Sequence, residues 1–90
     1  MALQDLTPAI RRELQLPAGR TGAAVTEVTP FGPAAEAGLQ PGDVILSVQG
    51  QTVRTAEETS KALASIPAGT TARIIVWQQG REALVRLRKR

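Results

Sequence analysis

Residues 31–50, with the sequence FGPAAEAGLQPGDVILSVQG, constrain the fold more than any other part of the chain. Pro33 suits the first position of a helix, because its fixed φ is helical and its missing N–H is not needed there. The alanine-rich residues that follow favour helix, and Gly38 can take the left-handed conformation that ends one. The first half of this segment therefore predicts a short helix.

The second half of the segment predicts a tight turn and a central strand. Pro41 and Gly42 are typical of the centre of a type II turn, in which glycine takes the positive φ. Asp43 can accept hydrogen bonds from the N–H groups of that turn through its short carboxylate. Residues 44–48 are almost continuously apolar, which indicates a strand buried on both faces.

The part of the chain before this segment predicts two strands with a helix between them. Residues 2–6 form a short candidate strand, and Thr7 can cap the helix that follows. Leu16 and Pro17 are expected to end that helix, because the residue before a proline disfavours helical dihedrals. Residues 23–28 are the next predicted strand.

The part after the segment predicts the longest helix and a hairpin. Thr55 and Glu58 form a T-x-x-E capping box at the head of a helix expected over residues 56–65. Residues 71–78 are rich in β-branched side chains, and a short turn returns the chain into a strand over residues 82–87.

These elements indicate a small α+β domain with five to six short strands and two to three helices. Hairpins rather than regular βαβ units connect the strands, which favours a partly open, mainly antiparallel β-barrel or sandwich. Ninety residues suffice for one domain with a single modest core. Gln49 and Gly50 stand where a hairpin turn prefers Asn-Gly, so a looser turn or a turn of another type is expected there.

The charge of the chain is concentrated at its end. Eleven basic and eight acidic residues give a net charge of +3, and the last three residues, Arg88, Lys89 and Arg90, are all basic. Without them the two signs balance at eight each, so we interpret the excess as a solvated tail rather than a basic face. No aromatic residues are interleaved with these charges, and nucleic acid is not expected as a partner.

The composition excludes several kinds of enzyme site. Cysteine and histidine are absent, which rules out a thiolate nucleophile, a Cys/His zinc site and a Ser-His-Asp triad. Asp5, Asp43 and Glu58 have no reactive partner nearby in the sequence and are interpreted as structural. We therefore predict no catalytic residues, no metal and no cofactor. No apolar run is long enough to span a bilayer.

The stretch AAEAGLQPGDVILSVQG resembles the signature of PDZ domains, in the variety attached to bacterial HtrA/Do-type (DegP-like) serine proteases. The stretch LQDLTPAIRRELQLP is similar to the segment that follows the ligand loop in those proteases. The resemblance covers nearly the whole chain. The lack of histidine and the ending near the last strand favour the second, carboxy-terminal PDZ domain of such a protein.

The resemblance implies a peptide site between residues 1–6 and residues 56–65, where a peptide's carboxy terminus adds as a strand to the sheet edge. The residues expected to bind the peptide are Met1, Ala2, Leu3, Gln4, Thr59, Ser60 and Leu63. Leu3 and Leu63 also fit ordinary core positions. Thr59 stands where the family has a larger apolar residue, which changes the pocket.

In that family a Φ-Gly-Φ loop just before the strand holds the terminal carboxylate of the peptide through backbone N–H groups. Met1 falls on the second Φ position. Residues 1–90 are therefore expected to be a single PDZ domain cut from a larger protein, with the carboxylate-binding loop truncated.

The resemblance implies a non-catalytic module that recognises carboxy-terminal or extended hydrophobic peptide segments for substrate capture or protease regulation. The parent protein would be a periplasmic serine endopeptidase. Partners would be peptides or unfolded protein segments, the protease domain and other PDZ domains. The alternative is an oligomer-assembly module that docks onto another domain and binds peptides little.

Overall fold

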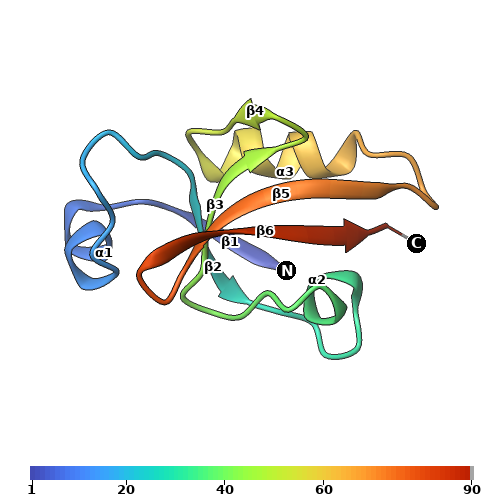
Figure 1. The fold of residues 1–90 in the computed structure, drawn as a ribbon, viewed down its shortest axis with the longest axis horizontal. Coiled ribbons are helices and arrows are strands. Elements are labelled where there is room, and N and C mark those ends of the chain that lie inside the picture. Colours follow the sequence, from blue (N-terminus) through green and yellow to red (C-terminus); the bar gives the residue numbers. More distant parts are fainter. Residues whose placement is uncertain (90) are drawn as a thin grey trace.

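A computed structural model of the chain describes residues 1–89, which form six strands and three helices (Figure 1). The elements in chain order are β1 (Ala2–Asp5), α1 (Pro8–Glu13), β2 (Ala23–Glu27), α2 (Pro33–Glu36), β3 (Val44–Val48), β4 (Gln51–Thr52), α3 (Ala56–Ala64), β5 (Thr71–Gln78) and β6 (Arg81–Arg88). The predicted α+β class with mainly antiparallel strands is confirmed.

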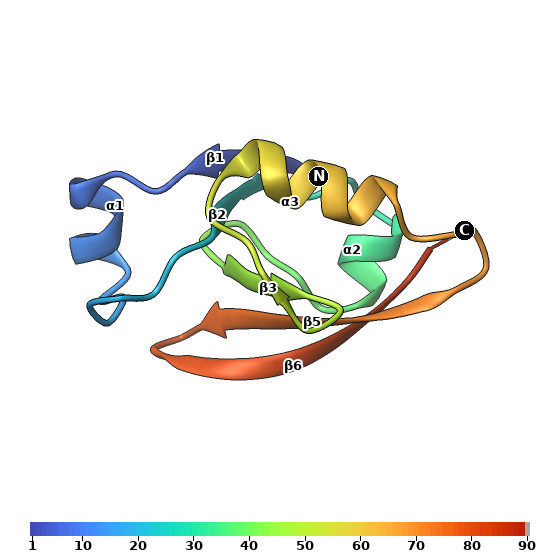
Figure 2. The ribbon, with the colours of Figure 1, turned by 90° about the horizontal axis from the view of Figure 1, so that it is seen from above.

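All strand pairs are antiparallel and belong to one sheet with the order β1-β2-β3-β5-β6, in which β4 pairs with β3. Figure 2 shows α3 running alongside β1 and β2 on one side of the molecule, while α1 lies apart at one end. The sheet is open, with β1 and β6 at the two ends of this order.

The main core lies between the inner face of the sheet and the helices α2 and α3. Its buried residues are Val25, Ala34, Leu39, Ile45, Val48, Val53, Ile66, Ala72, Ile74, Val76, Val85 and Leu87. Aliphatic side chains make up this whole cluster, as a chain with a single phenylalanine and a single tryptophan requires.

A second, smaller apolar cluster lies on the outer face of the sheet, where the sequence predicts only one core. Its buried members are Leu16, Val44 and Leu46, and Trp77 packs against them. The indole Nε1–H of Trp77 donates a hydrogen bond to the carbonyl of Leu14 at 3.0 Å. Successive strand residues point to opposite faces of the sheet, and both sets are apolar in β3, so its outer face also needs cover. The segment after α1 provides that cover.

The predicted turn before β3 is confirmed. Gly42 has a φ of +97°, and the N–H of Asp43 donates to the carbonyl of Gln40 at 3.1 Å. The Asp43 carboxylate accepts hydrogen bonds from the Gln40 N–H at 2.9 Å and from Nε2 of Gln78 at 2.7 Å. This buried carboxylate thus joins the turn to the end of β5.

The turn between β3 and β4 is tighter than the sequence predicts. Gln49 and Gly50 both have positive φ, at +52° and +82°, as in a type I′ hairpin turn. The N–H of Gln49 donates to the Arg73 carbonyl at 2.8 Å, and its side-chain Oε1 accepts from the Arg73 N–H at 3.0 Å. These two hydrogen bonds to β5 offset the steric cost of a left-handed glutamine.

Helix α1 ends at Glu13, earlier than the predicted stop at Leu16 and Pro17. Gln15 takes a left-handed φ of +55°, and the N–H of Leu16 donates to the Arg11 carbonyl at 2.9 Å. This is the hydrogen-bond pattern of a Schellman helix end, in which glutamine occupies the position that glycine prefers. The local closure ends the helix before the proline can.

Replacing Phe31 with asparagine is expected to stabilise the fold by about 0.5–1 kcal/mol. Phe31 has a φ of +62° at the third position of the turn Thr29–Gly32, and its side chain is 88% exposed. Asparagine tolerates this conformation better, and little packing is lost. Urea denaturation measures the change, with Phe31→Ala as the control that removes the ring but keeps the strain. A lower midpoint for Phe31→Asn than for the parent would contradict the interpretation.

Candidate functional site

Strand β1 offers an edge to which another strand can add. In the described sheet its hydrogen-bonded neighbour is β2, and its opposite side has no strand partner. The register with β2 shifts between Ala2, which faces Glu27, and Leu3, which faces Val25. Such a bulge increases the local twist of an edge strand. The free backbone groups of β1 therefore lie along an open and twisted edge.

Helix α3 runs antiparallel to β1 along that edge (Figure 2). At one end of this pair, the N–H of Ala56 donates to Asp5 Oδ1 at 2.6 Å, so β1 supplies a cap for the start of α3. At the other end, Met1 and Leu63 line the same pocket. The strand and the helix are therefore joined by a hydrogen bond at the Asp5 end, and the pocket lies at the Met1 end.

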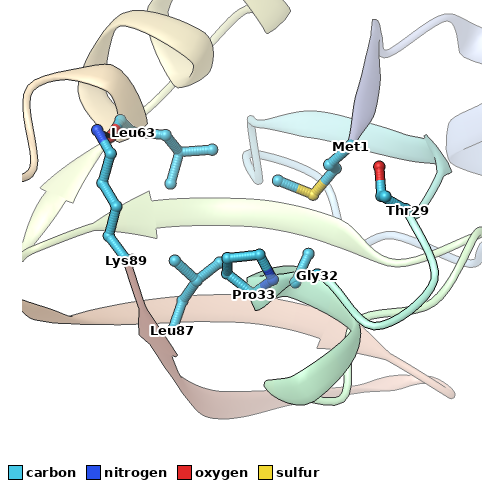
Figure 3. Close-up of a pocket in the computed structure, with 8 residues that line it drawn as sticks. Met1, Thr29, Gly32, Pro33, Leu63, Leu87 and Lys89 are labelled. Carbon is cyan, nitrogen blue, oxygen red and sulfur yellow. Dashed lines mark hydrogen bonds between the residues drawn. The ribbon is translucent and has the colours of Figure 1, made fainter. Parts of the chain in front are cut away.

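The pocket at the Met1 end has a volume of about 310 Å³ and a mostly apolar lining. Figure 3 shows Met1, Leu63, Leu87 and Pro33 around the same space. The residues that line it are Met1, Thr29, Gly32, Pro33, Ala34, Leu63, Leu87 and Lys89. An apolar side chain of a ligand would find aliphatic neighbours on every wall of this pocket.

Lys89 carries the one charged side chain among the described residues that line the pocket. Its Nζ donates hydrogen bonds to the carbonyls of Leu63 at 3.2 Å and Ala64 at 3.0 Å, at the end of α3. A cation at this position stabilises the carbonyl end of a helix. The prediction that Lys89 belongs to a solvated tail is therefore wrong; Arg90 lies outside the described residues.

The structure brings together two of the residues predicted from the sequence, Met1 and Leu63. Ala2 and Leu3 are half-buried, and Leu3 packs against the main core. Gln4 on β1 and Ser60 on α3 are exposed. These four residues lie along the strand and the helix rather than in the pocket lining.

Thr59 is fully buried, with 0% of its surface exposed. Its hydroxyl donates a hydrogen bond to the Thr55 carbonyl at 2.8 Å, one helical turn earlier. A threonine at this inward position satisfies its polar group within α3. In this structure Thr59 therefore has no surface with which to contact a ligand, and its effect on the site is through packing beneath the helix.

The far wall of the pocket was not predicted from the sequence. Pro33 and Ala34 open the short helix α2, and Leu87 and Lys89 come from the end of the chain. Ala83, Val85 and Leu87 are apolar at every second position, and this alternation could have indicated that Leu87 faces inward. The contact between α2 and β6 depends on the tertiary fold, and no local pattern in the sequence indicates it.

The family model for the PDZ domain matches residues 24–78, which include the turn, the central strand and α3. The chain is a PDZ domain. The PDZ domain is 48% identical over 79 residues to the magnetosome formation protease MamE of Magnetospirillum gryphiswaldense, covering 88% of this chain and 10% of that protein. It is 33% identical over 86 residues to a probable periplasmic serine endoprotease, DegP-like, of Bartonella henselae, covering 96% of this chain and 17% of that protein.

Solved structures of HtrA proteins share this fold. The HtrA-type protease AlgW with a decapeptide superposes with a TM-score of 0.82 at 30% identity, over 96% of this chain and 26% of that one. The HtrA3 PDZ domain bound to the phage-derived ligand FGRWV superposes with a TM-score of 0.80 at 23% identity, over 98% and 79% of the two chains. Among the described residues, no helix has the length and apolarity needed to cross a bilayer.

Proposed function

We propose that this PDZ domain binds carboxy-terminal or extended hydrophobic segments of polypeptides by strand addition to β1. The observation that carries the proposal is that the unpaired edge of β1 ends at an apolar pocket bounded by α3. An added strand gains main-chain hydrogen bonds along this edge, and a side chain in the pocket supplies selectivity.

The pocket is suited to a terminal apolar residue with a free carboxylate. Leu63 and Leu87 offer aliphatic surface, while Lys89 places an ammonium group at the rim. An ammonium group has three N–H donors, and two of those of Lys89 are used on the α3 carbonyls. The third can donate to the carboxylate of a peptide, with its charge assisting the hydrogen bond.

Two solved structures of similar fold support this assignment. The HtrA-type protease AlgW was solved with a decapeptide, and the HtrA3 PDZ domain was solved with the ligand FGRWV. The chain spans only about a tenth of the length of MamE and about a sixth of the length of the DegP-like endoprotease. We extend the proposal to a parent HtrA-type serine protease of the periplasm, in which this domain captures substrates or regulates the protease domain. A carboxylate-binding loop preceding Met1 would complete the site.

Replacing Leu63 with serine is expected to weaken binding of the peptide FGRWV by roughly fivefold or more, because apolar contact in the pocket is lost. An NMR titration of the labelled chain measures the affinity and maps the shifts, which should cluster on β1, α3 and the end of β6. Amidating the peptide terminus should weaken binding as well. Extending the chain upstream with the residues of the parent protein should strengthen it.

Leu84→Ser is the matched control, because Leu84 is exposed on the opposite face of β6 from Leu87. This variant should bind FGRWV as the parent does. Equal losses in the two variants, or shifts confined to the outer face of the sheet, would contradict the proposed site. Absence of any shift, even with the upstream residues restored, would favour the alternative of an assembly module.

A further inference from the structure

The hairpin of β5 and β6 places arginines and aliphatic residues together on the outer face of the sheet. Its register pairs Arg73 with Arg86 and Ile75 with Leu84, and Arg88 lies opposite Thr71 at the hairpin's open end. Directly paired residues of an antiparallel hairpin point to the same face, as do residues two apart along a strand. We call this outer patch, formed by Arg73, Ile75, Leu84, Arg86 and Arg88, the arginine face.

Arg88 is exposed, as the interpretation of a solvated end expects, but it belongs to a strand and not to a tail. Arg88 is part of β6 and continues a row that includes Arg86. Two like charges directly opposite each other destabilise a hairpin. Within residues 1–89, none of these three arginines forms an ion pair, and the nearby Glu82 is paired with Arg20 at 2.6 Å. The fold thus carries an unfavourable concentration of positive charge that its own carboxylates do not neutralise.

The centre of the arginine face is apolar and open. Leu84 is 51% exposed, opposite the half-buried Ile75. Ile75 lies at the margin of the second apolar cluster, whose Trp77 is covered by the segment after α1. A shallow hollow of about 420 Å³ adjoins this pair and is lined by Gln49, Gly50, Arg73, Ile75 and Leu84. The apolar surface of the second cluster therefore extends beyond the segment after α1 that covers it, and this extension is exposed to solvent.

We propose that the arginine face is a second binding surface, which takes an acidic polypeptide segment with apolar residues between its carboxylates. The hollow beside Ile75 and Leu84 would receive an aliphatic side chain. The guanidinium groups of Arg73 and Arg86 would each bind one carboxylate of the segment. A planar guanidinium can donate two parallel hydrogen bonds to the two oxygens of a carboxylate. Binding of two carboxylates would relieve the repulsion within the cross-strand pair.

The charges and the packing favour this partner over other classes. A second copy of the chain packed face to face would bring two sets of the same arginines together. Single-stranded nucleic acid is bound largely by stacking on exposed aromatic rings, and Trp77 is packed against the second cluster. Among the exposed large apolar residues of the described chain, Leu84 alone lies on this face, which is little for insertion into a bilayer.

The arginine face is independent of the proposed peptide site. Leu87, which lines the pocket, points to the inner side of β6, whereas Leu84 and Arg86 point to the outer side. One strand therefore contributes to two surfaces on opposite faces of the sheet. A peptide at β1 and an acidic segment at the arginine face could be bound at the same time.

An NMR titration with the acetylated and amidated peptide EELEELEE tests the proposal, because blocked ends remove the carboxylate that the pocket would take. Shifts are expected at the five residues of the arginine face. Arg86→Gln and Leu84→Ser should each weaken binding by roughly three- to tenfold, while Arg12→Gln on α1 should leave it unchanged. Raising the salt concentration should also weaken it.

A second measurement separates binding from a merely structural role. Arg86→Gln should raise the urea midpoint of the free chain while it weakens peptide binding, since the like-charge pair with Arg73 is removed. A lower midpoint would show instead that Arg86 supports the fold, and would overturn the argument from charge.

The proposal is overturned if the blocked peptide produces no shifts on the arginine face, or if the corresponding glutamine peptide binds equally well. It is also overturned if the chain dimerises through this face at micromolar concentration. Tighter binding to anionic vesicles or to single-stranded RNA at physiological salt, lost in Arg86→Gln, would assign the face to a membrane or a nucleic acid instead.

Discussion

Replacing Gly22 with alanine is expected to destabilise the domain by roughly 3–5 kcal/mol, or to prevent folding. A Cβ atom at this position would lie 2.0 Å from the carbonyl oxygen of Ile45 and 2.9 Å from its carbonyl carbon. Gly22 also has a φ of +156°, which residues with side chains rarely adopt. Because the obstructing atoms belong to the backbone of β3, no side-chain rearrangement can remove the clash.

Gly19→Ala is the matched control, since Gly19 has a φ of +86° but no atom within 4 Å of the place that an alanine methyl group would take. Gly19→Ala should lower the free energy of unfolding only by the cost of an unfavourable φ, about 1–2 kcal/mol. Urea denaturation of both variants gives the difference that belongs to the close approach between Gly22 and Ile45. Similar midpoints for the two variants would show that Gly22 does not approach the backbone of β3 this closely.

Replacing Ile74 with alanine is expected to lower the free energy of unfolding by about 2–5 kcal/mol. Ile74 is fully buried in the main core at the middle of β5, where it pairs with both β3 and β6. A small domain has a total stability of only about 5–15 kcal/mol, so this loss is a large share of it. Circular dichroism during urea titration measures the effect.

Leu84→Ala in the same hairpin provides the comparison, because Leu84 is half exposed on the outer face. Its loss should cost well under about 1 kcal/mol. A cost for Ile74→Ala no larger than that for Leu84→Ala would mean that the two faces of the hairpin are assigned the wrong way round. The same pair of variants also verifies that the arginine face points to solvent.

The local elements could be predicted because their causes act within a few residues. The Thr7 side chain accepts a hydrogen bond from the Ile10 N–H, and Thr55 accepts one from the Glu58 N–H, as the two cap sequences indicate. Gly42 supplies the positive φ that the turn before β3 needs. Each of these features depends on a dihedral preference or a short-range hydrogen bond that the neighbouring residues determine.

The hairpin of β5 and β6 was predicted from the sequence, and the interpretation of the charge at its end is where prediction failed. Arg88 was assigned to a solvated tail because it lies near the end of the chain. The register of β5 and β6 instead places it on the same face as Arg86 and Arg73. The sequence predicted that the two strands pair, but the charges were counted along the chain and not across the pair. Charge at positions far apart in the chain becomes a single patch only through that register.

By itself the sequence determined the order of the elements, the helix caps, the turn at Gly42 and the PDZ resemblance, all of which rest on local chemistry. Only the tertiary structure decided the burial of Thr59, the capping of α3 by Lys89 and the pocket shared by Met1 and Leu87. The reason is that packing and long-range hydrogen bonds depend on contacts between segments that the chain order leaves free.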